Sequence, residues 1–128
     1  MSSAIAHKIK IEVETNFRED LSDVLENSFF YNYTIRIENL GLAKVQLLRR
    51  YWRIDHLLIG SAVVSGDGVV GEQPILHPGE QFTYTSGCEI HNSTGRMSGY
   101  YTFRDLENGE LFRVAIPEFA LVYPVLLT

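Results

Sequence analysis

Cysteine and long apolar runs are scarce in this sequence of 128 residues. The one cysteine, Cys88, excludes an intramolecular disulfide and a zinc site built from several thiolates. No apolar stretch approaches the roughly 20 residues that a membrane-spanning helix needs. The amino terminus also lacks the basic start, apolar run and small-residue cleavage site of a secretion signal. These features predict a cytoplasmic protein with no membrane partner.

A basic surplus is also missing, because 11 lysine and arginine residues stand against 16 acidic ones, for a net charge of −5. Binding to nucleic acid through bulk positive charge is therefore excluded. Hydrophobic residues make up 45% of the chain, which excludes a disordered polymer. We expect residues 1–128 to form a single domain, since the length suffices for one core and not for two.

Apolar residues alternate with polar ones in most of the chain, with a period of two. The pattern is clearest over residues 9–13, 29–37, 97–103 and 112–116, and Asn108-Gly109 supplies a hairpin turn before the last of these. Successive strand side chains point to opposite faces, so each segment predicts a strand with one buried face. Such strands are typical of antiparallel sheets.

Three segments depart from this pattern. In residues 45–54 the apolar residues change phase, and a one-residue bulge near Leu48 to Arg50 would return them to one face. Pro117 cannot donate to a strand ladder, so we expect a bend there before a last strand from Phe119 to Leu127. Residues 15–28 fit either one or two helical turns or an acidic loop.

Seven or eight short strands without a covering helix predict an all-β sandwich of two antiparallel sheets packed face to face. Residues 66–87 read GDGVVGEQPILHPGEQFTYTSG, in which Gly66, Gly68 and Gly71 match the dinucleotide-binding fingerprint. That fingerprint requires a helix after the glycines, and Pro74 and Pro78 prevent one. We therefore interpret the glycines as tight turns between strands, while a shallow anion nest of backbone N–H groups stays open as an alternative.

The sequence resembles the ApaG (CorD) family over nearly its whole length. The resemblance lies in Asn39-Leu40-Gly41, residues 45–54, residues 66–87, residues 97–101 and residues 116–121. It implies a fibronectin type III or immunoglobulin-like β-sandwich and a small bacterial cytoplasmic protein. It also implies an association with cobalt resistance and magnesium efflux, gene neighbourhood with diadenosine tetraphosphatase, and related domains in larger eukaryotic proteins, including an F-box protein, which suggests protein interaction.

No catalytic constellation is apparent, so we expect a protein that is not an enzyme and has no cofactor. Ser86 lacks a nucleophile elbow, and Cys88 has no nearby cation in the sequence and is expected to act as a small buried hydrophobe. The four histidines are not spaced as metal ligands, so we predict no metal site.

Two aromatic residues, Phe30 and Tyr100, fall on the phase where a strand should be polar. Beside Arg49 or Arg50 they would form an aromatic and arginine surface typical of interface hot spots. A loop or a chain terminus covering that face is the alternative. Lysines in Lys8-Ile9-Lys10 protect an edge strand, through which a homodimer is still conceivable.

The sequence thus favours a non-catalytic binding module that recognises an unidentified protein partner. Its candidate binding residues belong to the glycine loop and to one sheet face: Gly66, Gly68, Gly71, Gln73, Pro74, Phe30, Tyr100, Arg49 and Arg50. One alternative is a nucleotide or phosphate ligand at the same glycine loop. A second alternative is direct binding of a divalent cation.

Overall fold

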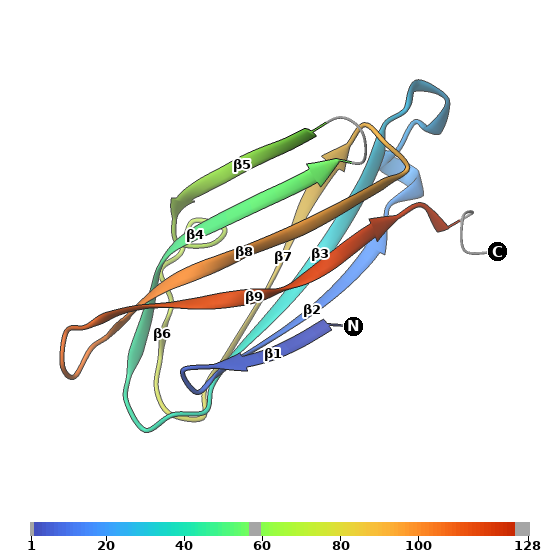
Figure 1. The fold of residues 1–128 in the computed structure, drawn as a ribbon. Helices are drawn as coiled ribbons and strands as arrows, with labels where there is room; N and C mark the ends of the chain where they lie inside the picture. The colour runs from blue at the N-terminus through green and yellow to red at the C-terminus, as the bar shows by residue number, and fades with distance from the viewer. Residues whose placement is uncertain (1, 57–59, 125–128) are drawn as a thin grey trace.

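A computed structural model describes residues 2–56 and 60–124, and within them nine strands form two antiparallel sheets that pack face to face (Figure 1). The first sheet has the order β1-β2-β3-β7: β1 (Ser2–Ala6), β2 (Ile9–Phe17), β3 (Phe29–Asn39) and β7 (Gln81–Ile90). The second has the order β5-β4-β8-β9: β5 (Gly60–Asp67), β4 (Val45–His56), β8 (Thr94–Asp105) and β9 (Leu111–Val122), with β6 (Ile75–Leu76) also paired to β4. The predicted sandwich is confirmed, with nine strands where seven or eight were expected. Lys10 belongs to β2, which lies between β1 and β3, so the expectation that Lys8 and Lys10 protect an edge strand is wrong.

The core lies between the two sheets, where the alternating apolar residues of both meet. In β3, every second residue from Phe29 to Asn39 is buried, and Tyr101 and Phe103 of β8 are fully buried opposite them. Aromatic rings pack edge to face between the two sheets, as Trp52 of β4 does against Tyr33 of β3. Period-two alternation in the sequence therefore identified the buried faces correctly.

The predicted bulge in β4 is present. Leu47 pairs with Phe103 and Arg49 pairs with Thr102, so Leu48 is the extra residue. As a result Val45, Leu47 and Trp52 are all buried, and Ile54 packs partly buried against them. The bulge also turns the side chains of Arg49 and Tyr51 to the outer face of this sheet.

Pro117 does not end a strand, in contrast to the predicted bend. β9 continues through it to Val122. The register with β8 shifts between Met97 and Gly99, so Pro117 lies at an irregular position of the ladder, where a proline is tolerated. The end of the predicted last strand, residues 125–127, lies outside the described residues.

Residues 15–17 continue β2, and residues 18–28 form an acidic connecting loop rather than an α-helix. After β2 the chain makes two single 3-10 turns, η1 (Glu19–Leu21) and η2 (Val24–Glu26). Leu25 is 97% exposed, so the apolar spacing in this segment buries no face. No helix within the described ranges is long and apolar enough to cross a membrane.

Candidate binding site

Arginines gather on the outer face of the five-stranded sheet. The register of β4, β8 and β9 places five of the eight arginines of the chain there, all exposed: Arg49, Arg53, Arg96, Arg104 and Arg113. Three carboxylates share this face and pair with arginines, in Arg49–Asp67 at 2.8 Å, Arg53–Asp55 at 3.0 Å and Arg96–Glu118 at 3.2 Å. The face is thus positive on a chain whose net charge is −5.

The outer face of the other sheet has the opposite balance. Its strand residues include two cations, Lys10 and Arg36, and four carboxylates, Glu12, Glu14, Glu38 and Glu89, together with threonines such as the hydrogen-bonded pair Thr34 and Thr85. The two outer faces of the sandwich therefore differ in sign. An acidic ligand is attracted to the five-stranded sheet.

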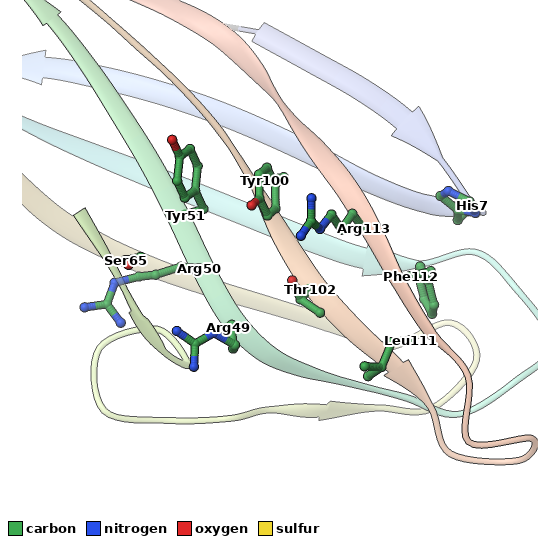
Figure 2. A pocket seen from close by; sticks show the side chains of 10 residues that line it. All are labelled: His7, Arg49, Arg50, Tyr51, Ser65, Tyr100, Thr102, Leu111, Phe112 and Arg113. Carbon is green, nitrogen blue, oxygen red and sulfur yellow. The ribbon is translucent and has the colours of Figure 1, made fainter. Parts of the chain in front are cut away.

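Two tyrosines form the centre of the positive face. Tyr51 and Tyr100 are direct cross-strand partners, and their rings stack at 4.8 Å between centroids with an interplanar angle of 8°. The guanidinium carbon of Arg113 lies 4.5 Å from the centroid of the Tyr100 ring. Figure 2 shows the three side chains in a row across β4, β8 and β9.

This row forms part of an open depression of about 750 Å³ in the face. The lining side chains come from β4, β5, β8 and β9 and include Arg49, Tyr51, Ser65, Tyr100, Thr102 and Arg113 (Figure 2). We call this set of six residues the tyrosine–arginine face. Planar guanidinium groups and half-exposed aromatic rings are the side chains enriched in interface hot spots.

Salt bridges do not occupy all of the cations on the face. Asp55 accepts hydrogen bonds from Ser61 and Arg53, which hold the pKa of its carboxyl below the usual range. In contrast, the guanidinium of Arg113 lies over an aromatic ring, and that of Arg104 donates to the carbonyl oxygen of Gly109 at 3.3 Å. These two arginines keep N–H donors available for a carboxylate ligand.

The glycine loop, residues 66–74, is fastened to the bulge of β4. The N–H of Gly68 and the side-chain amide of Gln73 both donate to the carbonyl oxygen of Leu48, at 2.7 and 3.0 Å. The N–H of Leu47 donates to the carbonyl oxygen of Pro74 at 3.0 Å. The loop is therefore a structural continuation of the sheet edge.

A tight turn closes the loop. The N–H of Val69 donates to the carbonyl oxygen of Glu72 at 2.8 Å, and the N–H of Glu72 donates to the carbonyl oxygen of Val69 at 2.9 Å. Val70 and Gly71, between them, have φ values of 43° and 80°. The side chain of Val69 is fully buried in the core. After the turn the chain enters β6, so no helix follows Gly71 to meet a pyrophosphate.

Arg50 directs its guanidinium to this loop. Its Nη1 donates to the carbonyl oxygens of Asp67 and Gly68, at 3.0 and 3.1 Å, and fills the space where Gly66 has no Cβ. The N–H groups of Gly68, Val69 and Glu72 are already bonded within the fold. A phosphate at the loop would have to compete with these bonds.

The structure brings together most of the residues singled out from the sequence, but not Phe30. Arg49, Arg50, Gly66 and Gly68 adjoin one another, and Tyr100 lies on the same sheet. Phe30 belongs to β3 in the other sheet, where its ring covers Gly87 on the opposite outer face. A joint surface of Phe30 and Tyr100 is therefore wrong, because strand phase does not reveal which sheet a strand joins.

Sequence reasoning missed Tyr51, Thr102, Ser65 and Arg113 as site residues. Thr102 and Arg113 fall on the polar phase of their strands, and Tyr51 does so once the bulge at Leu48 is counted. Ser65 belongs to β5, whose exposed residues do not alternate, so it had no such signal. The cross-strand pairing that stacks Tyr51 on Tyr100 is non-local and has no signature in the sequence.

Nucleophilic and metal chemistry find little support in this arrangement. Burial, and to a smaller extent the Glu89 carboxylate, raise the pKa of the Cys88 thiol to about 11. At neutral pH that thiol is protonated and is a poor nucleophile. In residues 2–56 and 60–124, no three histidine, cysteine or acidic side chains lie close enough to hold a metal ion.

Comparisons with known proteins place the chain. The family model of the ApaG domain matches residues 19–105. Proteins named ApaG from Pectobacterium carotovorum and Mesorhizobium japonicum are each 43% identical to it, covering 95% and 97% of this chain and 97% and 95% of theirs. A crystal structure of an ApaA protein from Bordetella pertussis superposes with a TM-score of 0.87 at 39% identity, covering 91% of this chain and 94% of that one. The chain belongs to the ApaG family.

Proposed function

We propose that this protein is a non-catalytic binding module that recognises an acidic segment of a partner protein on its tyrosine–arginine face. The observation that supports the proposal is the concentration of five exposed arginines around a tyrosine stack, on one outer face of an otherwise acidic chain. Arginine and tyrosine contribute strongly to protein interfaces because they combine apolar area with directed hydrogen bonds.

The same face fits a protein better than a nucleotide. A depression of about 750 Å³ that is open on one side leaves much of a small ligand in water, whereas small-molecule sites enclose most of their ligand. In the glycine loop, the N–H groups of Gly68, Val69 and Glu72 already donate to carbonyl oxygens of the protein. The loop also carries two carboxylates, those of Asp67 and Glu72. These features favour a protein ligand over a phosphate at the loop.

The proposal is tested with a capped eight-residue peptide of alternating valine and glutamate, titrated into the protein and followed by amide chemical shifts. We expect saturable shifts on β4, β8 and β9 and an affinity that falls with added salt. Replacing Arg113 with glutamate (Arg113→Glu) should weaken binding about tenfold, since a like charge then faces the peptide.

The matched control is Arg36→Glu, which reverses an exposed arginine on the opposite outer face. It should change the affinity less than about twofold, because screening at physiological salt reaches about 8 Å. Equal losses in the two variants, or no saturable shift at all, would contradict the proposal. Inorganic pyrophosphate is titrated in parallel, and saturable shifts confined to Gly66–Gly71 would support the phosphate alternative instead.

A further inference from the structure

The acidic loop between β2 and β3, residues 18–28, exposes three apolar side chains. Leu21, Val24 and Leu25 are 51%, 37% and 97% exposed. Figure 1 shows this loop projecting beyond the ends of β2 and β3. Exposed apolar side chains that gather in one place mark interaction sites, whereas single ones are ordinary. A leucine that is almost fully exposed beside two further apolar residues therefore indicates a surface for a binding partner.

The loop is held in one shape by hydrogen bonds. The N–H of Asp23 donates to the carbonyl oxygen of Ser28, and the N–H of Ser28 donates to that of Asp23, both at 2.9 Å. The side-chain amide of Asn27 donates to the carbonyl oxygen of His91 at 3.0 Å, which fastens the loop to the segment between β7 and β8. A surface that is ordered before binding loses little conformational entropy when a partner covers it.

Carboxylates flank the exposed apolar side chains. The loop carries four acidic residues and one arginine, and this arginine, Arg18, is paired with Asp20 at 2.6 Å. Within the described part of the chain, Glu19, Asp23 and Glu26 form no ion pair. We call residues 19–26 the acidic tip. It combines an apolar surface with three carboxylates that are available to cations.

The complementary chemistry lies at one end of the depression in the five-stranded sheet. Leu111 lines that depression and is 57% exposed. Its cross-strand partner is Arg104, and Arg113 follows two residues later on the same outer face. The guanidinium groups of these two arginines have no carboxylate partner among the described residues. Glu110, which precedes Leu111, lines a neighbouring hollow and not this depression.

The acidic tip and the Leu111 end of the depression are remote from each other in one molecule. Figure 1 shows the loop between β2 and β3 at one end of the sandwich and the start of β9 at the other. Leu25 at 97% exposure contacts no face of its own chain. A contact between the two surfaces is therefore a contact between two copies.

We propose that a second copy of this chain supplies the acidic segment, by docking its acidic tip on the tyrosine–arginine face; this rests on the function proposed above and names the partner. Carboxylates of the tip pair with Arg104 and Arg113, and Leu25 covers Leu111. Opposite charges beside matching apolar side chains give the contact its specificity. The net charge of −5 on each copy opposes the approach of two copies and keeps the association weak.

The contact joins two different surfaces, so it is heterologous. Each copy in a pair leaves one tip or one face open to a further copy, and such contacts continue unless a ring closes. Pairing of two identical edge strands would instead be symmetric and would end at two copies. The size of the assembly therefore distinguishes the two modes of association.

The first experiment is sedimentation of the full chain over a range of concentrations. We expect the weight-average mass to rise with concentration above that of one chain and to pass that of two. Saturating valine–glutamate peptide should return the chain to the monomer, because the peptide occupies the same face. A mass that stops at two copies, or an assembly that the peptide leaves intact, would overturn the inference.

The second experiment changes the tip and the face separately. Leu25→Ser and Arg113→Glu should each weaken self-association at least about tenfold. The matched control Leu42→Ser, which changes a leucine that is 88% exposed on another loop, should stay within about twofold of the original chain. Mixed together, Leu25→Ser and Arg113→Glu should form a one-to-one complex, since the first keeps an intact face and the second an intact tip.

The outcomes separate this inference from the proposed function. A chain that stays monomeric up to about 1 mM and still binds the valine–glutamate peptide would overturn the inference and leave the function standing. Self-association that Leu25→Ser or Arg113→Glu leaves unchanged would also overturn it, as would a mixture of the two variants that forms no complex. A chain that neither associates nor binds the peptide would contradict both.

Discussion

Replacing Gly68 with alanine is expected to lower the free energy of unfolding by roughly 3 kcal/mol. A Cβ at this position would lie 2.1 Å from the carbonyl oxygen of Glu72, and the φ of +61° already disfavours any side chain. The clash is with backbone that the exchange of hydrogen bonds between Val69 and Glu72 holds in place. Relief therefore requires the turn to open and Val69 to leave the core.

The matched control is Gly71→Ala in the same loop. Gly71 has a φ of +80°, but a Cβ there would meet nothing within 4 Å, so the loss should be about 1 kcal/mol. Urea denaturation of both variants gives the two values. Equal losses would show that backbone conformation alone decides the cost. A large side chain at position 68 would accordingly damage the fold before it tested binding.

The arrangement of each strand could be predicted from the sequence because it is a local property. Alternation fixes which residues of one strand share a face, and the change of phase between Leu47 and Trp52 revealed a bulge that the structure contains. Pro117 was harder, since a proline ends pairing in a regular ladder but fits an irregular one. The difference depends on the partner strand and not on the proline.

The candidate site could be predicted only in part, for the same reason. Strand phase placed Phe30 and Tyr100 on outer faces, where both are half-buried, but the order of strands decides that they lie on different sheets. Arg49 and Arg50 are neighbours in the sequence, yet one extends over the outer face and the other donates to loop carbonyls. Which strands adjoin is set by long-range pairing that one sequence does not display.

The glycine loop illustrates how a local pattern can be conspicuous for structural reasons. Gly66 leaves room for the Arg50 guanidinium, Gly68 allows a close approach to Glu72, and Gly71 completes a tight turn. Each glycine has a steric role in the loop without any ligand. The loop as a binding site stays a prediction, and the tyrosine–arginine face beside it provides the stronger chemistry for binding.

The free energy of unfolding is also expected to fall above pH 9, with Cys88 accounting for about 2 kcal/mol of the loss by pH 11. Burial raises the pKa of this thiol from about 9 to about 11. Between these values the unfolded chain has lost the thiol proton and the folded chain retains it. Because the folded state binds more protons there, stability decreases as pH rises, and the contribution is complete only below pH 9.

The comparison that isolates this effect is Cys88→Ala, measured by urea denaturation under reducing conditions from pH 8 to pH 11. The wild-type chain should lose about 2 kcal/mol more than the variant over this range. A decrease common to both is expected to begin above pH 10, since burial also raises the pKa of Tyr31 from 10.0 to about 12. Parallel curves for the two proteins would mean that the Cys88 thiol ionises in the folded state as readily as in the unfolded state. The thiol would then have to be accessible to solvent and would become a candidate nucleophile.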